Sequence, residues 1–512
     1  ASNPSDGIAL VSVSALPDNR VRVAITGTDA PPSADFQIAA SGLVASVAVG
    51  EATAQTSNED AIQLTVTGAQ GDDDYFVPNA SAATRTDTPL RDVPQAIQVI
   101  PEQVIEAQQA TRLEEVLENA AGVNFLGNTD GRGLNFSIRG FNDAQVLRNG
   151  FLTGASNTVE AEVANLERVE VLRGPASVLF GASEPGGVIN LVSKKPLSEP
   201  YYNVQLQGGN RNFVSPSIDV SGPLTEDGRL LYRLNALYRR EDSFRNYDNS
   251  FERFFIAPTV TGLIGDSTEL TINLEYAEDT EPADFGTLAF GDGIAAISPE
   301  PVLNNPGDMV EQNYLNTGYS LEHRFDENWK LRNQFRYTSS LYKFSVFPLP
   351  IAFDETTGTL TRFFADQFSQ EDAFSFNTDI QGSFSTGSVD HTLLFGVDLQ
   401  RLESESVTTG DFSTPAPLNI FDPDYDAFPT PSAGNFPLLG ISSETITNQV
   451  GFYLQDQIDV FDNLILVAGL RYDAVDQDTT NLLTNLETSQ NDQAFTPRVG
   501  LVYQPTDPIS LS

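Results

Sequence analysis

From residue 201 onward the chain alternates apolar and polar side chains over long segments. In residues 230–239, Leu230 and Tyr232 fall on one face of an extended strand, while Arg233 and Asn235 fall on the other. Alternation of this kind has the two-residue period of a β-strand with one apolar and one polar face. The same pattern recurs at residues 270–277, 329–337 and 464–473. This part of the chain therefore predicts a large antiparallel sheet.

The predicted strands fit a transmembrane β-barrel better than a soluble sandwich. Each spans about ten residues, with an apolar face, a polar face and aromatic residues towards its ends, as a membrane barrel requires. A sandwich has shorter strands and fewer charges on its inner face. Long connections, expected on the outer side, are residues 277–310, 344–361 and 404–443. We count roughly a dozen to fourteen strands, whereas plugged transporters have about 22, so we expect a barrel incomplete at its carboxyl-terminal end.

The segment before the predicted sheet mixes helices with strands. Residues 93–100 form a predicted strand, and Pro101 starts a helix. Thr111 is the predicted N-cap of a second helix over residues 112–121, with Glu114 completing a capping box. The apolar residues that follow helical spacing and should face a core are Leu113, Val116 and Leu117.

Residues 166–196 place two predicted strands around two sharp reversals. Gly174-Pro175 ends the first strand, because proline fixes its own φ and glycine permits a positive φ. One helical turn fits residues 176–181, and a second reversal precedes the apolar strand at residues 188–192. By pattern alone, this segment is a compact α+β unit.

The identities of these residues point to a known family. Residues 166–196 resemble the end of the plug domain of TonB-dependent outer-membrane receptors. Their residue identities are most similar to those of the siderophore receptors within that family. Two earlier stretches carry the same resemblance in the expected order. The motifs are Arg173-Gly174-Pro175, Leu179-Phe180-Gly181, Pro185-Gly186-Gly187, Ser137-Ile138-Arg139-Gly140-Phe141 and the run from Asp92 to Pro101.

The resemblance implies a mainly β fold, a transmembrane antiparallel β-barrel with an N-terminal α+β plug domain inside its lumen. Residues 1–50 form a small β-rich module that resembles the AMIN domain carried by some cyanobacterial receptors. Residues 51–83 are a linker, residues 84–196 the plug and residues 197–512 the barrel.

The resemblance also implies three sets of functional residues. The alternating segment Ile62, Gln63, Leu64, Thr65, Val66, Thr67 and Gly68 is similar to a TonB box, and an exposed segment of this kind can add to a partner's sheet through main-chain hydrogen bonds. Outward loops of the plug should contact ligand through Arg132, Asp143, Gln145, Ser156 and Asn157. The residues implied to hold the plug in place, with the two arginines set against barrel glutamates, are Arg139, Gly140, Arg173, Gly174, Pro175, Gly186 and Gly187.

Composition narrows the range of partners. The chain has 28 Lys and Arg against 70 Asp and Glu, a formal net charge of −42. Such a surface repels phosphates, which argues against a nucleic-acid partner. The absence of cysteine excludes disulfides and thiolate metal sites. With only two histidines, His323 and His391, we expect no bound metal or cofactor, and iron would arrive already chelated.

The resemblance therefore implies a monomeric receptor in the lipid of a Gram-negative outer membrane, and the AMIN-like module implies a cyanobacterial source. The receptor would bind a ferric siderophore outside and import it with energy from TonB and the ExbB–ExbD complex. The same architecture could carry haem or cobalamin, and a passive porin is a second class of function. We find no GxSxG elbow or HExxH motif that would indicate an enzyme.

Overall fold

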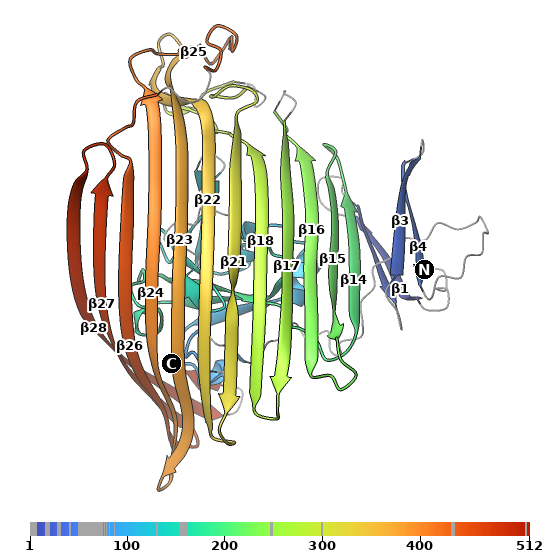
Figure 1. Cartoon of the computed structure of the whole chain (residues 1–512), viewed down its shortest axis with the longest axis vertical. Helices are drawn as coiled ribbons and strands as arrows, with labels where there is room; N and C mark the ends of the chain where they lie inside the picture. The colour runs from blue at the N-terminus through green and yellow to red at the C-terminus, as the bar shows by residue number, and fades with distance from the viewer. Residues whose placement is uncertain are drawn as a thin grey trace.

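The computed structural model describes residues 8–15, 21–27, 32–39, 42–49, 75, 77, 79–80, 82–86, 88–129, 132–152, 161–245, 249–297, 301–431, 436–506 and 509–512. Within these residues, one antiparallel sheet of 16 strands dominates the molecule. Figure 1 shows it as a tall curved wall running from β14 to β28. No helix in the described part of the chain is long and apolar enough to cross a membrane.

The strands of the wall follow one another in sequence order, so each pairs with its neighbours through antiparallel connections. Their bounds are β14 (Tyr201–Gly208), β15 (Val214–Pro223), β16 (Leu230–Asp242), β17 (Ser250–Ile264), β18 (Thr268–Pro282), β21 (Met309–Arg324), β22 (Trp329–Asp354), β23 (Thr359–Thr386), β24 (Val389–Asp411), β26 (Ser443–Phe461), β27 (Leu464–Asn481), β28 (Leu486–Thr506) and β29 (Ile509–Leu511). The short strand β25 (Leu418–Asn419) pairs with β23.

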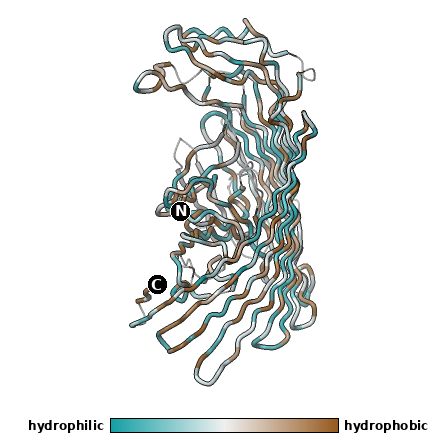
Figure 2. The backbone as a smooth tube through the Cα atoms, turned by 90° about the vertical axis from the view of Figure 1, so that its left-hand side faces the viewer, coloured by the Kyte–Doolittle hydropathy of each residue, from teal (hydrophilic) through white to brown (hydrophobic). Residues whose placement is uncertain are grey.

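Burial along β16 confirms the predicted two-faced strand, with the polar face turned inward. The polar residues Arg233, Asn235 and Arg239 are buried, whereas Tyr238 is 37% exposed. The polar face therefore points to the concave side of the wall, and the apolar face points outward. This arrangement is that of a barrel whose outer surface meets lipid. Figure 2 shows the wall curving around a smaller body of chain on its concave side.

The two ends of the wall differ in their connections. At one end the turns are short, at residues 265–267, 325–328, 387–388 and 462–463. At the other end, the top of Figure 1, lie the long connections 283–308 and 412–442. The prediction of a long loop at residues 344–361 is wrong, because β22 and β23 continue to a turn at residues 355–358. Irregularities in the pairing beside Pro348 and Pro350 accommodate both prolines within the strand.

The smaller body contains a five-stranded sheet in the order β11-β10-β13-β12-β7. Its strands are β7 (Ile97–Pro101), β10 (Gln145–Arg148), β11 (Phe151–Leu152), β12 (Leu166–Arg173) and β13 (Gly187–Ser193). Three short helices join them, α1 (Glu102–Gln108), α2 (Leu113–Leu117) and α3 (Ser177–Phe180), after a 3-10 turn at Leu90–Asp92. Small paired strands complete the body, β5 (Asn79–Ala80) with β6 (Thr88–Pro89) and β8 (Val123–Thr129) with β9 (Arg132–Ile138).

The core of this body contains the predicted helical face. Leu113, Val116 and Leu117 of α2 are at most 2% exposed and pack with Val169 and Ile189. The predicted cap is displaced by one residue, because Arg112 is the N-cap and Glu115 occupies the third position. The carboxylate of Glu115 accepts hydrogen bonds from the main-chain amides of Thr111 and Arg112 at 2.6 and 3.2 Å. The glutamate of the capping box is therefore Glu115, and the prediction of Glu114 is wrong.

Four strands fall within the predicted amino-terminal module: β1 (Ile8–Ala15), β2 (Val21–Gly27), β3 (Pro32–Ala39) and β4 (Gly42–Val49). They form two antiparallel pairs, and β2 also pairs with β14 at the edge of the wall. The resemblance of this module to an AMIN domain stays a prediction. Two further strands, β19 (Ala289–Phe290) and β20 (Gly293–Ile294), form a hairpin in the long connection before β21.

Candidate functional site

The interface between the smaller body and the wall contains buried charges that pair across it. Arg148, at the end of β10, donates to the Glu275 carboxylate on β18 through Nη2 at 2.6 Å and Nε at 3.0 Å. Arg148 is 2% exposed and Glu275 is 4% exposed. Asn165 accepts a further hydrogen bond from Arg148. Because buried charges are tolerated only with partners, this pair fixes β10 against the wall.

A second buried cluster centres on Glu162 of the smaller body. Its carboxylate lies 3.1 Å from Arg253 of β17 and 3.5 Å from Arg239 of β16. Arg253 is held in turn by Asp279 through two hydrogen bonds of 2.7 Å. Burial alone would raise the pKa of Glu162, but Arg239 and Arg253 outweigh it and lower this pKa. Glu162 therefore stays ionised inside the protein.

A third contact joins the start of helix α1 to the wall through Lys194. The Lys194 ammonium lies 2.6 Å from Glu102 of α1 and 3.0 Å from Asp219 of β15. Asp219 also accepts two hydrogen bonds from Arg233. Burial alone would lower the pKa of Lys194, but Asp219 and Glu102 outweigh it and raise this pKa. The lysine is thus a permanent cation that bridges the helix and the wall.

The segment 82–86 is held by its main chain, and we call it the latch. Side chains from three wall strands donate to three successive carbonyls of the latch. These hydrogen bonds run from Arg498 to Ala83 at 2.8 Å, from Gln455 to Thr84 at 3.1 Å and from Arg332 to Arg85 at 2.5 Å. These three side chains of the wall could donate to a latch of any sequence, because every residue has a main-chain carbonyl oxygen.

The side chain of Arg85 adds a charged contact to the latch. Its guanidinium lies 3.0 Å from Asp398 of β24 and rests over the rings of Phe180 and Tyr453. Asp398 also accepts from Arg471 of β27 at 2.6 Å. The latch is therefore tied to both helix α3 and the wall.

The predicted ligand-contacting residues are only partly described. Ser156, Asn157 and the side chain of Arg132 lie outside the described residues, as do all of Ile62 to Gly68. Asp143 is exposed, with a positive φ of 58°. Gln145 donates to the carbonyl of Ala182 at 3.0 Å. The ligand-binding and TonB-box assignments stay predictions.

The predicted plug arginines lie side by side rather than across the interface. Arg173 donates to the carbonyl of Ala121 at 2.7 Å and to Gln98 at 2.5 Å. Burial and the nearby charge of Arg139 lower the pKa of Arg173. Among the described residues, neither arginine forms an ion pair with a wall glutamate. Their anchoring role against such glutamates stays a prediction.

Glycines of the predicted plug motif allow close backbone approach. A Cβ on Gly186 would lie 2.4 Å from the carbonyl oxygen of Ile138. A Cβ on Gly187, whose φ is +140°, would lie 2.0 Å from the carbonyl oxygen of Leu172. Gly140 and Gly174 also have positive φ angles, of 84° and 97°. A side chain at either of the first two positions would separate paired segments of the plug.

Sequence reasoning missed Arg85, Arg148, Glu162 and Lys194 as anchors. Arg148 ends an apolar run, and its partner Glu275 lies on the polar face of a recognised strand. These two patterns could have identified both residues as inward-facing charges. They could not have shown that the two residues pair with each other, because only the fold sets how the plug is placed against the wall. Within the described residues, no group of three His, Cys, Asp or Glu gathers as a metal site would require.

A polar-lined antiparallel wall curved around an α+β domain is the architecture of a plugged β-barrel. The chain belongs to the family described as TonB dependent receptor-like, beta-barrel, whose model matches residues 257–512, and a TonB-dependent Receptor Plug Domain matches residues 89–188. Membership supports the fold class and indicates a receptor rather than an enzyme.

Curated relatives include siderophore receptors of several bacteria. The ferrichrome outer membrane transporter/phage receptor of Escherichia coli (strain K12) is 30% identical over 466 residues, which cover 83% of this chain and 60% of that protein. The ferrioxamine B receptor of Salmonella typhimurium (strain LT2) is 29% identical over 443 residues, covering 83% and 61%. The chain therefore spans about 60% of the length of these relatives.

Solved structures share the fold. The siderophore receptor PiuA from Acinetobacter baumannii aligns with a TM-score of 0.74 and 20% identity, over 84% of this chain and 65% of that one. BauA, the ferric preacinetobactin receptor of the same organism, gives a TM-score of 0.75 and 23% identity, over 85% and 65%.

Proposed function

We propose that this protein is an outer-membrane receptor of a Gram-negative bacterium that binds a ferric siderophore outside and imports it into the periplasm. The observation that carries the proposal is that a separate domain lies against the polar face of the wall and is held there by noncovalent ion pairs. Two such pairs are Arg148 with Glu275 and Arg85 with Asp398. A passive pore has no need of such a domain, whereas a gated transporter does.

The cargo is proposed from the relatives and from the chemistry of the chain. Relatives are named for ferrichrome and ferrioxamine B, which favours a hydroxamate or mixed-ligand chelate. A chelated iron needs shape, aromatic surface and hydrogen bonds rather than metal ligands. The absence of cysteine and the presence of only two histidines suit that requirement.

We propose that TonB binds the segment Ile62 to Gly68 and pulls on it, using energy supplied by the ExbB–ExbD complex. An added strand is bound through main-chain hydrogen bonds, so its amide groups matter more than its side chains. The latch at residues 82–86 follows this segment along the chain. Tension applied at the segment would therefore reach the latch before the rest of the plug.

The experiment is uptake of radio-iron by iron-starved cells that express the natural full-length protein. The panel comprises ferrichrome, ferrioxamine B, a ferric catecholate, haem and cobalamin. We expect accumulation of one ferric chelate that is abolished by Val66→Pro, which removes an amide proton, and by a proton uncoupler. Val66→Ala is the matched control and should retain uptake.

Two outcomes would contradict the proposal. Accumulation insensitive to the uncoupler and to Val66→Pro would indicate passive diffusion. Uptake of haem or cobalamin alone would keep the transport mechanism and replace the cargo.

A further inference from the structure

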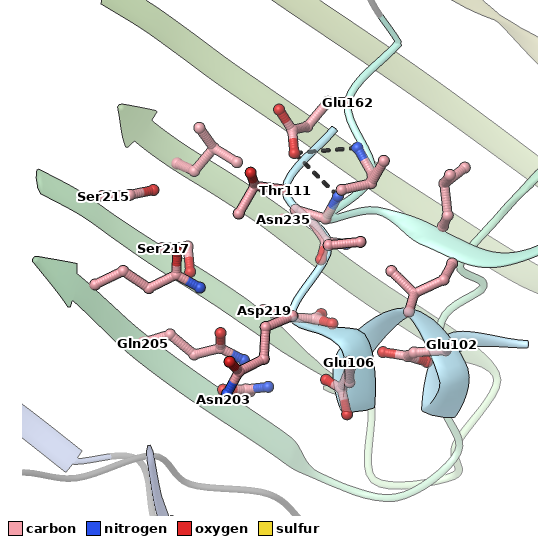
Figure 3. A pocket seen from close by; sticks show the side chains of 18 of the residues that line it. Glu102, Glu106, Thr111, Glu162, Asn203, Gln205, Ser215, Ser217, Asp219 and Asn235 are labelled. Atoms are coloured by element: carbon pink, nitrogen blue, oxygen red, sulfur yellow. Dashed lines mark hydrogen bonds between the residues drawn. The ribbon is translucent and has the colours of Figure 1, made fainter. Parts of the chain in front are cut away.

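The two ends of the molecule are filled in different ways. A polar hollow lies between helix α1 and the wall strands β14 to β16, and Glu162 and Lys194 of the plug are among the residues that line it (Figure 3). At the outer end of the wall, by contrast, the long connections 283–308 and 412–442 pack against each other through apolar side chains. We call the described parts of these two connections the outer unit.

The outer unit shares one apolar core with the tip of β23. Leu303 of the first connection, Leu360 of β23 and Leu418 of the second connection are each at most 3% exposed. Phe290 and Phe421 meet edge to face between the two connections, with 5.8 Å between their ring centroids. Loops mostly run over the protein surface, so a shared buried core shows that these two connections are folded against each other.

Arg362 of β23 donates hydrogen bonds to both connections from a fully buried position, with 0% exposure. Its Nε donates to the carbonyl of Ala416 in the second connection at 2.9 Å. Its Nη1 donates to the carbonyls of Leu303 and Asn304 at 3.2 and 3.0 Å and to Oδ1 of Asn305 at 3.3 Å, all in the first connection. All four acceptors are neutral oxygens, so dipoles from both connections surround this buried cation.

The position of Arg362 makes the stability of each connection depend on the other. A buried guanidinium is costly unless acceptors surround it. If the first connection unfolded, Nη1 would lose three acceptors, and if the second unfolded, Nε would lose the carbonyl of Ala416. We therefore expect the two connections to order and disorder together.

Further hydrogen bonds join the two connections without Arg362. The Tyr425 hydroxyl donates to the carbonyl of Val302 at 2.9 Å and accepts from the amide of Val302 at 3.0 Å. Asn305 donates to the hydroxyl of Thr430 at 2.9 Å. These contacts lie within the chain, so they can form before any cargo binds.

We infer that Arg362 is a positioning residue for cargo binding, because it couples the two connections and holds the outer unit in its binding conformation before the chelate arrives. This inference rests on the proposed function, in which the chelate binds at the outer end of the wall. Arg362 is buried and acts through the connections, not by touching the chelate. An ordered unit binds without the entropic cost of ordering loops, whereas only the ordered fraction of a loosened unit can bind.

The first measurement is amide hydrogen exchange of the natural full-length protein in detergent, without chelate. Arg362→Met keeps an unbranched side chain and removes every donor. We expect the amides of residues 301–308 and of residues 412–420 to exchange about tenfold faster or more in this variant, because both segments lose their shared donor. Arg401→Met is the control, since Arg401 pairs with Glu403 on an exposed surface of β24, and it should leave exchange in both segments unchanged.

The second measurement is binding of radio-iron ferrichrome, or of the panel chelate that the wild type binds, to cells treated with an uncoupler. We expect Arg362→Met to raise Kd about tenfold or more through slower association, with the dissociation rate within about twofold of the wild type. Excess chelate should restore slow exchange in both segments, because binding selects the ordered unit. A residue needed only for folding would reduce the number of receptors at the surface and leave Kd unchanged.

A disulfide can replace the lost hydrogen bond to the second connection. Thr359 of β23 and Asn419 of β25 are directly opposed in an antiparallel pair, which gives two cysteines the separation that a disulfide requires. The chain has no cysteine that would compete. Added to Arg362→Met, oxidised Thr359→Cys with Asn419→Cys should return Kd to within about threefold of the wild type, and reductant should remove the recovery.

Faster exchange in only one of the two segments of Arg362→Met would overturn the inference, because the connections would not be coupled. An unchanged Kd with both segments loosened would also overturn it. If Arg362→Met does not reach the membrane, Tyr425→Phe provides the test. Loss of its hydroxyl should speed exchange in both segments and raise Kd about threefold, and no change in either would overturn the inference.

The proposed function and this inference can fail separately. If wild-type cells bind no chelate of the panel, the proposed function fails and the positioning role fails with it. If the wild type binds a chelate and Arg362→Met binds it with the same Kd, only the positioning role fails.

Discussion

Arg85 and Asp398 form an ion pair of 3.0 Å across the boundary between the plug and the wall. Arg85 lies in the latch, and Asp398 also accepts from Arg471, so one carboxylate serves two guanidinium groups, of which Arg471 is buried and Arg85 is partly exposed. This pair stands between the proposed TonB-gripped segment and the body of the plug. Its strength therefore bears on how readily the plug is released.

Replacement of the shared carboxylate should loosen the latch. In Asp398→Asn, Arg85 and Arg471 lose a counter-charge whose side chain is 19% exposed, and we expect a loss of about 3 kcal/mol in the free energy of unfolding of the plug. Urea unfolding of the detergent-solubilised receptor, followed by tryptic cleavage within the plug, would measure it. The control is Asp266→Asn, because Asp266 pairs with Arg229 at 3.3 Å on an exposed turn. A loss of this size in the control would contradict the assignment.

The long connection 283–308 should respond to pH through Asp308. Burial raises the pKa of Asp308 from 3.8 to about 6, although hydrogen bonds from Asn304 and Asn305 partly oppose the shift. Because the folded connection binds the proton more tightly, its stability is greatest at low pH and falls as pH rises from about 4 to about 6. The expected loss is about 2–3 kcal/mol.

Amide hydrogen exchange of residues 283–308 at pH 4.5 and pH 7, corrected for intrinsic rates, would test this dependence. In Asp308→Asn, the amides of residues 283–308 should be equally protected from exchange at pH 4.5 and at pH 7. Asp292→Asn changes an exposed carboxylate of the same connection and should leave the dependence unchanged. Greater protection at pH 7 in the wild type would show that the sign is wrong.

Gly187→Ala should disrupt the plug. The added Cβ would lie 2.0 Å from the Leu172 carbonyl oxygen on the paired strand, and the φ of +140° is unfavourable for alanine. We expect a loss of about 3 kcal/mol or more in the free energy of plug unfolding, measured by urea titration. Gly293→Ala, with no atom within 4 Å of the added Cβ, should change it by less than about 0.5 kcal/mol. A normal urea midpoint for Gly187→Ala would contradict the close approach of β12 and β13.

Glu115→Ala should destabilise the plug by about 1 kcal/mol, because its carboxylate caps two amides at the start of α2. The urea midpoint of plug unfolding would report the change. Glu118→Ala alters an exposed glutamate at the end of the same helix and should have little effect. If the two variants lose equal stability, the cap assignment is wrong.

Some features of the plug follow from local chemistry, and others do not. The turn at Gly174-Pro175 and the buried face of α2 could be predicted because each depends on residues close in sequence. The cap was misplaced by one residue, since Glu114 and Glu115 offer the same carboxylate and only helix geometry selects between them. The strands through Pro348 and Pro350 were missed because irregular pairing with β23 accommodates residues that otherwise favour loops.

The amino-acid sequence by itself determined the alternating strands, their apolar outer face and the family-like motifs of the plug, because these depend on residue type and short spacing. Only the tertiary structure decided that Arg148 meets Glu275, that Lys194 bridges Glu102 and Asp219, and that a hollow lies beside α1. A chain with 70 acidic and 28 basic residues offers many alternative charge pairs. Desolvation makes a buried charge costly unless its partner is correctly placed, and that placement follows from the packing of plug against wall.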